Sequence, residues 1–510
     1  MKNLKKQSLF YFGQEAFNEV WIFGLLFIYL KYKDCLMRIY GHFLKIHWIL
    51  LLLFLILFSC GKNGIDDFQR DFTELRFGMF LHFGIRTFTG GRWGEANQDI
   101  HQFDPVHLDC GQWADAAVAA NMKFGILTTK HHDGFCLWDS DYSEFDVAAI
   151  PWRDGKGDVV REYVDAFRSR GLAPCLYYSI WDNTEGIGNG PITEKHMEII
   201  KGQLTEILSN YGEIKMLFID GWSWKMGHVE VPYPQIRKLV KDIQPSCLLV
   251  DNTHLPCLFN NDLIHYEAGG DCPSDNTLPA LLSQLINTHG GNGWFWDAEI
   301  PTANLVNVDS LKNDLDYLES RWCTFILNCP PNPDGLLDDN IVNRLNEVGE
   351  IWSSDPARPE LPMQFPQIET FIVPVSATAT SGDANKAIDG KNDRYYYSVW
   401  ESSRDLPQSL TIDLGEEYHD LNILYYVPKY IPMVSPQKEG SIQSYKIHAS
   451  LDGTDFMEIV QGEWNGDTKM KVVTFPPTHG RYIRLEVLSA VDGFAAVTEI
   501  AIGQSDHKKK

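Results

Sequence analysis

Two acidic residues follow predicted strands, in positions where a side chain can take part in chemistry. Asp220 comes after Met216–Ile219, four apolar residues that predict a strand buried on both faces, and Glu267 comes after the candidate strand Leu263–Tyr266. A pair of carboxylates suits glycoside hydrolysis, in which one acts as nucleophile and the other protonates the leaving oxygen. Separations of about 5–5.5 Å and roughly 6.5–9.5 Å correspond to retaining and inverting mechanisms, and both remain open here. A helix N-cap or a turn is the alternative role for Asp220.

Histidines form a second group of candidates. His82 closes one predicted strand, and Lys130-His-His-Asp-Gly134 follows another. These residues could ligate a metal ion for hydrolysis. However, adjacent residues on a strand point to opposite faces, and the sequence has neither an HxH nor an HExxH spacing. Hydrogen bonding of His82, His131 and His132 to sugar hydroxyls is the favoured interpretation, with a buried structural role as the alternative for one of the adjacent pair.

The elements that must position these residues alternate between apolar strands and amphipathic helices. The candidate strands are Phe77–Phe83, Phe124–Thr129, Ala173–Ile180, Met216–Ile219, Cys247–Val250, Leu263–Tyr266, Gly293–Trp296 and Cys323–Leu327. The amphipathic stretches include Leu108–Asn121, Asp158–Arg170, Thr193–Tyr211 and Tyr233–Ile243. Eight strands with intervening helices predict a (β/α)8 barrel over residues 61–355, with the site at the carboxyl ends of the strands. A doubly wound sheet is the alternative, but no Gly-rich phosphate loop opens a βα unit.

Composition excludes several classes of partner. The chain has 510 residues, 44% of them hydrophobic and 13% aromatic, which indicates a globular protein of two or three domains. The formal charge of −24 argues against nucleic acid and against an anionic membrane surface as partners. The 10 cysteines show no spacing typical of a zinc site.

Residues 1–60 differ from the rest of the chain. Basic residues precede the unbroken apolar run Trp48–Phe58, which is followed by Ser59-Cys60-Gly61. A run of this length is typical of a signal peptide rather than of a membrane span. The segment resembles a bacterial lipoprotein signal, which implies acylation of Cys60 and a lipid anchor in the cell envelope, periplasmic or at the cell surface. A start at Met37 would give a signal of normal length, and an uncut signal anchor is the alternative.

Five segments together carry a resemblance to a known family. They are Phe77-Gly-Met-Phe-Leu-His-Phe-Gly84, Leu127-Thr-Thr-Lys-His-His-Asp-Gly-Phe-Cys-Leu-Trp138, Gly155-Lys-Gly-Asp158, Ser179-Ile-Trp-Asp182 and Phe218-Ile-Asp-Gly-Trp222. Over about residues 70–354 the sequence resembles glycoside hydrolase family 29, the α-L-fucosidases. The resemblance implies a retaining mechanism without a cofactor, with Asp220 as nucleophile and fucosylated oligosaccharides or glycoconjugates as substrates. It also implies a fucose pocket lined by His82, Trp93, His131, His132, Tyr178 and Trp222.

The resemblance extends to one branch of the family. Glu267 resembles the general acid/base of the branch that prefers α-1,3/1,4-linked fucose on branched glycans. The segment Trp294-Phe-Trp-Asp297 points to the same branch and adds Trp296 to the substrate-binding candidates.

Two departures from the family pattern concern the edge of the predicted pocket. The family often has Glu-Trp where this chain has Arg92-Trp93, and Glu95, two residues on, is the remaining candidate for that contact. Ser-Pro-Trp-Asp of the branch is Ser179-Ile-Trp-Asp182 here. They leave two alternatives to an α-L-fucosidase: a hydrolase for another L-sugar such as L-galactose, and a non-catalytic glycan-binding lipoprotein.

The C-terminal third predicts a second domain of a different class. A Pro-rich linker at 356–367 precedes an all-β jelly-roll sandwich at 368–505, and 506–510 is a basic tail. The candidate strands are Ser409–Leu414, Leu421–Tyr426, Ser444–Ser450, Met470–Phe475 and Arg481–Val487. Ala387-Ile-Asp-Gly390, Ser450-Leu-Asp-Gly453 and Gly480-Arg-Tyr-Ile-Arg-Leu485 resemble the discoidin (coagulation factor 5/8 C-type) domain. Such domains often bind sugars and hold a structural calcium, for which Asp389 and Glu499 are the candidates; a turn is the alternative role for Asp389.

Overall fold

The computed structural model describes residues 65–505 apart from positions 91–93, 97, 229, 254, 268–271, 288–292, 363, 393–396 and 430–437. The predicted signal segment with Met37 and Cys60, the residue Trp93 and the tail 506–510 lie outside the described residues. Within the described range, no helix is long and apolar enough to cross a membrane.

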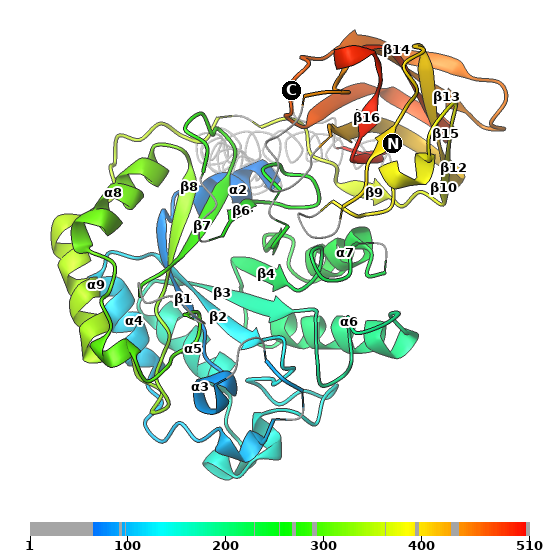
Figure 1. The fold of residues 1–510 in the computed structure, drawn as a ribbon. Coiled ribbons are helices and arrows are strands. Elements are labelled where there is room, and N and C mark those ends of the chain that lie inside the picture. The colour runs from blue at the N-terminus through cyan, green and yellow to red at the C-terminus, as the bar shows by residue number, and fades with distance from the viewer. Residues whose placement is uncertain are drawn as a thin grey trace, which may run out of the picture. The chain divides into compact units, whose positions relative to one another are not determined.

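The first domain is built on eight strands that pair in parallel. They are β1 Phe77–Leu81, β2 Phe124–Lys130, β3 Ala173–Ser179, β4 Met216–Asp220, β5 Leu248–Asp251, β6 Ile264–Tyr266, β7 Ala280–Leu285 and β8 Cys323–Asn328. The strand order is β5-β4-β3-β2-β1-β8-β7-β6, so β5 and β6 are the two ends of the hydrogen-bonded ladder. The predicted barrel architecture is confirmed (Figure 1). Because the paired strands are all parallel, their carboxyl ends lie at one face.

Helices accompany most of these strands. They are α2 Ile65–Thr73, α3 Arg86–Thr89, α4 Cys110–Ala119, α5 Val159–Ser169, α6 Glu194–Ser209, α7 Tyr233–Ile243, α8 Val308–Glu319 and α9 Asp339–Ile351. Figure 1 shows α4, α5, α8 and α9 on the outside of the sheet. The described residues contain no helix between β5 and β6 or between β6 and β7, which departs from a regular (β/α)8 repeat.

The seventh strand differs from the prediction. The structure places it at Ala280–Leu285, where six residues pair with Cys323–Asn328 of β8, and not at Gly293–Trp296. The aromatic run Trp294-Phe-Trp296 lies in the segment that follows β7, with Trp294 packed against His82. Aromatic content indicates burial in a strand and in a site loop equally well, so the run led the prediction to the wrong segment.

Side chains of the strands alternate between two apolar layers. Residues such as Phe80, Tyr177 and Phe218 form a cluster inside the sheet, and residues such as Leu176 and Leu217 belong to the larger cluster that includes the helices. Successive residues of a strand point to opposite faces. In β4, Asp220 therefore shares the inner side with Met216 and Phe218, and the strand carries it to the mouth of the barrel.

The second domain consists of antiparallel strands in a main sheet and a separate two-stranded sheet of β11 and β16. Its strands are β9 Thr370–Ile372, β10 Ser376–Ala379, β11 Trp400–Glu401, β12 Gln408–Val427, β13 Ile442–Ser450, β14 Met457–Glu463, β15 Lys471–Ala490, β16 Ala496–Val497 and β17 Glu499–Gln504. The order of the main sheet is β14-β13-β15-β12-β17-β9, with β10 also paired to β12. Four of the predicted strands merge in pairs into β12 and β15, whose ladder shifts register between Asp413 and Ile423. The predicted all-β class is confirmed.

Candidate active site

Asp220 lies at the end of β4, surrounded by hydrogen-bond donors. Its Oδ2 accepts a hydrogen bond from Tyr177 Oη at 2.9 Å. Its Oδ1 accepts from the backbone N–H of Gly221 at 2.6 Å, from Trp224 Nε1 at 2.7 Å and from Asn252 Nδ2 at 3.5 Å. The side chain keeps 14% of its surface exposed. The carboxylate is therefore held in one orientation while a small part of it stays open to the mouth of the barrel.

The surroundings of Asp220 lower the pKa of its carboxyl group. Burial alone raises the pKa of Asp220, but the adjacent His132 and the hydrogen bonds from Trp224, Gly221 and Tyr177 outweigh burial, and the net pKa lies below the usual value. Burial also lowers the pKa of His132 to about 4, so this imidazole is uncharged at neutral pH. Asp220 is therefore anionic at neutral pH, and its hydrogen-bond donors add to the effect of His132 on its pKa. An ionised carboxylate in a fixed orientation has the properties of a nucleophile.

His82 and His131 pack as neutral rings beside Tyr177. Burial lowers the pKa of His82 to about 3 and that of His131 well below its usual value. His82 Nδ1 lies 2.7 Å from Asn328 Oδ1, which fixes the ring at the end of β1. The His131 ring stacks on Tyr177 with centroids 5.6 Å apart. Both imidazoles can therefore exchange neutral hydrogen bonds with a polar substrate without competing with the charge of Asp220.

His132 is the imidazole nearest to Asp220 among the three. Its Nε2 lies 3.9 Å from Asp220 Oδ2, and its Nδ1 lies 2.7 Å from Ser179 Oγ. The ring stacks on Trp181 with centroids 4.6 Å apart. Contacts on both the edge and the face of the ring fix its orientation beside the carboxylate.

Glu267 comes directly after β6 and is partly exposed. Its charge contributes to a pKa of Tyr177 well above the usual value, after the larger effects of burial and of Asp220. Because β6 runs parallel to β7 and β8, its carboxyl end, after which Glu267 follows, lies at the same face of the barrel as the carboxyl end of β4. The pairing of Asp220 with Glu267 in catalysis stays a prediction.

A hydrogen-bonded row inside the barrel supports the residues between Asp220 and β6. Asn252 donates from Nδ2 to Asp220. The Oδ1 atom of Asn252 lies 2.9 Å from Nδ1 of His265. The other ring nitrogen, Nε2, lies 2.9 Å from Ser283 Oγ on β7. His265 is the second residue of β6, so the row fixes the strand that presents Glu267.

Aromatic residues after β7 close one side of the site. The rings of Trp294 and Phe295 lie 5.0 and 5.4 Å from that of His82. The guanidinium of Arg86 lies 4.7 Å above the Phe295 ring. Burial lowers the pKa of Arg86 to about 10, so the group remains a cation at neutral pH. This side of the site combines flat apolar faces with one buried positive charge.

Among the residues that the structure describes, no group of three or more His, Cys, Asp and Glu side chains is arranged to hold a metal ion. The histidines instead bond to Asn328 and Ser179 and stack on aromatic rings. The chemistry that the arrangement supports directly is that of two carboxylates with neutral hydrogen-bonding partners.

The chain matches two known protein families, one for each domain. The family model described as "Alpha-L-fucosidase" matches residues 63–354, and the model described as "F5/8 type C domain" matches residues 373–500. The chain belongs to the alpha-L-fucosidase family. Its members are glycoside hydrolases, and the second domain is of the F5/8 type C class.

Plant proteins are among the most similar relatives. "Putative alpha-L-fucosidase 1" of Oryza sativa subsp. japonica is 33% identical over 441 residues, which cover 80% of this chain and 79% of that protein. "Alpha-L-fucosidase 1" of Arabidopsis thaliana is 33% identical over 302 residues, which cover 54% of this chain and 58% of that protein. A crystal structure of a putative alpha-L-fucosidase from Bacteroides thetaiotaomicron is similar over 86% of this chain and 98% of its own, with 22% identity and a TM-score of 0.48.

In this alpha-L-fucosidase family member, two predicted pocket residues lie elsewhere. Tyr178 and Trp222 are both fully buried and do not reach the group around Asp220. Tyr178 Oη donates to Gln203 Oε1 at 2.8 Å, and Trp222 Nε1 donates to the carbonyl of Val231 at 2.8 Å. These contacts place both side chains in the packed core, and a role of Tyr178 or Trp222 in lining the pocket stays a prediction.

Local geometry explains the positions of Tyr178 and Trp222. Tyr177 and Tyr178 are neighbours on β3 and point to opposite faces, so Tyr177 is the one that reaches the barrel interior and Asp220. After β4, Gly221 has a φ of 65°, and the turn there directs Trp222 into the core. Trp224 is the tryptophan that donates to Asp220.

The remaining substrate-binding candidates differ in position. Glu95 is exposed, and Trp93 lies outside the described residues. Trp296 is partly buried and donates from Nε1 to Asp338 Oδ2 at 2.7 Å. In the same segment it is Trp294 that packs on His82. Contact of Glu95 or Trp296 with a substrate stays a prediction.

Several residues of the site were absent from the sequence-based candidates: Tyr177, Ser179, Trp181, Trp224, Asn252, Trp294 and Asn328. Tyr177 had a usable signal, since strand alternation relative to the buried Cys175 places it on the inner face. Asn252 and Asn328 stand at strand ends and belong to the polar rim that the barrel predicts. Trp224 lies in an irregular turn, for which the sequence gives no periodic signal.

Proposed function

We propose that the chain is an exo-acting, retaining α-L-fucosidase that removes terminal α-L-fucose from glycans, with Asp220 as nucleophile. The observation that carries the proposal is the ionised Asp220 carboxylate, held by Tyr177, Trp224 and Gly221 at the mouth of the barrel. A carboxylate fixed in this way can attack an anomeric carbon without first losing a proton. Membership of the alpha-L-fucosidase family supports the choice of sugar.

Glu267 is the proposed general acid/base. It is partly exposed at the same barrel mouth, so it can reach both a leaving oxygen and an incoming water. The resemblance of Glu267 and of Trp294-Phe-Trp-Asp297 to the α-1,3/1,4-preferring branch supports terminal fucose on branched oligosaccharides as the substrate.

The experiment that tests the function uses a soluble form of the protein that begins after Cys60. Release of free L-fucose is measured from an aryl α-L-fucoside and from a branched Lewis-type oligosaccharide, and the anomer formed first is identified by proton NMR. We expect release from the branched glycan, little from the aryl fucoside, and α-L-fucose as the first product. Release of the β anomer would contradict the retaining mechanism. Release of L-galactose but not of L-fucose from matched glycosides would contradict the choice of sugar.

The F5/8 type C domain contains a polar site that fits a calcium ion. Glu499 is buried, and within the described part of the chain its Oε1 has no hydrogen-bond partner; the same holds for both polar atoms of Asn392. Burial and the neighbouring Asp389 carboxylate raise the pKa of Glu499 well above its usual value. Two carboxylates and an amide oxygen are hard ligands of the kind that calcium prefers. We propose that Asp389, Asn392 and Glu499 contribute to a structural calcium site.

Calcium should stabilise the folded protein through this site. We expect millimolar calcium to raise the melting temperature of the second domain by about 5 °C over a sample in EDTA, because the ion binds the folded state only. Differential scanning calorimetry measures the change. In Glu499→Gln, which keeps the size of the side chain but removes its charge, the response to calcium should be lost. Equal melting temperatures of the unmodified protein in calcium and in EDTA would refute the site.

We also propose a lipid anchor at Cys60, on the resemblance of residues 1–60 to a lipoprotein signal. Expressed with this segment in a bacterium, the protein should enter the detergent phase on Triton X-114 partitioning. Cys60→Ser should move it to the aqueous phase, because the acyl chains would be missing. Cys35→Ser, in the same segment, is the matched control and should leave partitioning unchanged. An equal effect of both substitutions, or of neither, would argue against acylation of Cys60.

A further inference from the structure

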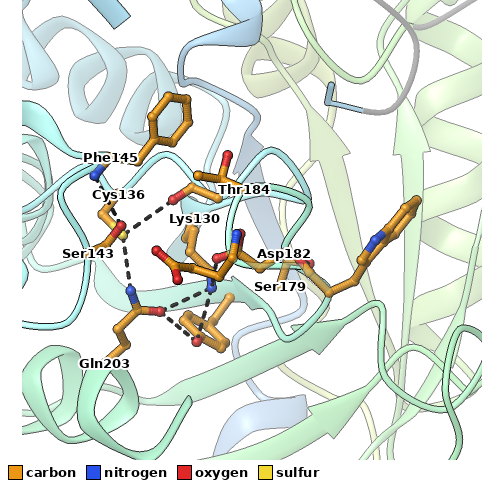
Figure 2. A network of polar contacts seen from close by, with 12 residues as sticks. Lys130, Cys136, Ser143, Phe145, Ser179, Asp182, Thr184 and Gln203 are labelled. Carbon is orange, nitrogen blue, oxygen red and sulfur yellow. Dashed lines mark hydrogen bonds and ion pairs between the residues drawn. The ribbon is translucent and has the colours of Figure 1, made fainter. Parts of the chain in front are cut away.

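A buried ion pair joins the end of β2 to the segment after β3 (Figure 2). Lys130 Nζ lies 2.9 Å from Asp182 Oδ2, and neither side chain is exposed. The same ammonium lies 3.0 Å from Gln203 Oε1 and 3.2 Å from Tyr178 Oη, so three acceptors surround its three N–H donors. Burial alone lowers the pKa of Lys130, but Asp182 and the other neighbours raise it above the usual value, so the cation persists at any physiological pH.

A β-bulge turns Lys130 towards this network. The pairing of β2 with β3 shifts register between Thr128 and Lys130, so that Lys130 stands opposite Tyr178. The bulge thereby directs the ammonium to the side of the sheet on which α6 supplies Gln203. His131 and His132 follow directly, so the position of the two histidines depends on where the bulge ends.

Gly134 packs directly against the carboxylate of the pair. A Cβ atom at Gly134 would lie 2.3 Å from Asp182 Oδ1, closer than real contacts allow. The φ of 92° at Gly134 also belongs to the region that favours glycine. The Asp182 Oδ1 atom in turn accepts a hydrogen bond from the backbone N–H of Glu185 at 2.9 Å, which shapes the segment after β3.

Further contacts join the segment after β2 to the segment after β3. The backbone N–H of Asn183 donates to the carbonyl of His132 at 2.9 Å. Thr184 Oγ1 donates to the carbonyl of Asp133 at 2.6 Å. The ring of Trp181 stacks on His132. The ion pair and these contacts thus connect the segment after β3 to His132, the imidazole beside Asp220.

Ser179 determines which nitrogen of His132 carries the proton. Its hydroxyl donates to the carbonyl of Trp181 at 2.6 Å. Because the single hydroxyl proton is used there, Oγ can only accept from His132 Nδ1 at 2.7 Å. In the neutral ring Nδ1 then carries the hydrogen and Nε2, which faces Asp220, is an acceptor.

We propose that the Lys130–Asp182 pair and Ser179 are positioning residues, which hold His132 beside Asp220 with Nε2 presented as the acceptor for a hydroxyl group of the sugar. This inference deepens the proposed function and rests on it for the identity of the substrate. None of the three residues touches the reacting atoms; they act through the orientation and tautomer of His132. An acceptor suits this position because four donors already reach the Asp220 carboxylate, and a further donor at His132 Nε2 would compete with the substrate for it.

The charges around His132 agree with this role. Three cations on different elements lower the pKa of His132, and one anion raises it. The charged groups are Arg86 on α3, Lys130 on β2, Lys225 after β4 and Asp220 on β4. His131 and His82, the other titratable neighbours, are neutral. Removal of the Lys130 charge should raise the pKa of His132. As the pH falls, Nε2 of His132 would then become protonated at a higher pH than in the unmodified protein.

The first test observes the tautomer without turnover. In protein labelled with 15N-histidine, with the His132 signals assigned by their absence from His132→Gln, we expect the Nδ1–H tautomer from pH 5.5 to 8. Ser179→Ala should show a mixture of tautomers, because the hydroxyl acceptor is gone. An Nε2–H tautomer in the unmodified protein would overturn the proposal whether or not the protein releases fucose, which separates this failure from a failure of the proposed function.

The second test measures fucoside hydrolysis. Lys130→Met/Asp182→Asn removes both charges together, so neither is left buried alone, and Asn can still accept from Glu185. We expect kcat/KM to fall about a hundredfold, as displacement of a group near the chemistry typically does, with the acid limb of its pH profile moved to higher pH. Ser179→Ala should also lower kcat/KM. This single variant serves as the test if the double variant does not fold. Retention of kcat/KM within twofold by Ser179→Ala would overturn the proposal.

A matched control separates positioning from stability. Arg76 and Glu319 form another ion pair with little exposure, 9% and 10%, and Arg76 precedes β1 at the opposite end of the strands. Arg76→Met/Glu319→Gln should lower the melting temperature and leave the pH profile of kcat/KM unchanged. An equal shift of the pH profile in both double variants would overturn the role assigned to the Lys130–Asp182 pair.

Discussion

Replacement of Asp220 with Ala is expected to lower kcat for fucoside hydrolysis by at least about a thousandfold, as loss of a catalytic nucleophile does. The reason is that Asp220 would form the bond to the anomeric carbon, and no other carboxylate receives its hydrogen bonds. Tyr177 and Trp224 would remain in place as donors to a small vacant site. The measurement is single-turnover kinetics with the branched oligosaccharide and with an activated dinitrophenyl fucoside, with the fold checked by circular dichroism and melting temperature.

Azide supplies the decisive control for the role of Asp220. The anion can enter the space left in Asp220→Ala and attack the anomeric carbon, with departure of the aryl alcohol and formation of a fucosyl azide of inverted configuration. Asp220→Asn keeps the volume of the side chain, so it should be inactive and should not respond to azide. Near-normal turnover by a folded Asp220→Ala protein would exclude the nucleophile assignment. Inverted product from the unmodified enzyme would assign Asp220 to the activation of water instead.

Replacement of Glu267 with Ala should give a loss that depends on the leaving group. For a branched oligosaccharide, whose leaving alcohol needs a proton, we expect kcat/KM to fall about 10²–10⁴-fold, the usual contribution of general acid catalysis. For a dinitrophenyl fucoside, whose leaving group departs as an anion, the fall in kcat/KM should be less than about tenfold. Steady-state rates on the two substrates measure the difference.

Glu95 provides the comparison for Glu267, because it is the other carboxylate predicted from the sequence to contact the substrate. Glu95 is exposed, whereas Glu267 is partly exposed and follows β6 at the carboxyl ends of the strands. Glu95→Ala should therefore change kcat/KM by the same factor for the branched oligosaccharide and for the dinitrophenyl fucoside. The opposite result would reassign the general acid to Glu95. In that case Glu95→Ala would lower kcat/KM for the branched oligosaccharide but not for the dinitrophenyl fucoside, and Glu267→Ala would lower both alike.

The sequence predicted the fold class and the place of Asp220 at the end of a barrel strand, because both depend on periodic patterns. Runs such as Met216–Ile219 define a buried strand, and the acid at the end of the run then falls at the carboxyl face of a parallel barrel. The same reasoning placed His82 and the His131-His132 pair close to Asp220, where the structure shows them.

The sequence was ambiguous where a pattern had two physical causes. Tyr177 and Tyr178 are identical in type, and only the phase of the strand tells which one faces the interior. The turn at Gly221 decides between Trp222 and Trp224 by backbone conformation rather than by composition. The aromatic segment at 294–296 was apolar enough for a strand but belongs to the wall of the site. Irregular segments of this kind carry no period, so their contacts depend on the assembled barrel.

The contact of Gly134 with Asp182 has a consequence for how related sequences can diverge. A side chain at position 134 would collide with the carboxylate at 182, and loss of that carboxylate would leave a lysine charge buried alone. The two positions are therefore expected to change together or to stay fixed, although 48 residues separate them along the chain. A homologue with a larger residue at 134 should carry a small residue at 182 and an uncharged one at 130. In an ancestral reconstruction, the three substitutions should appear on the same branch of the tree.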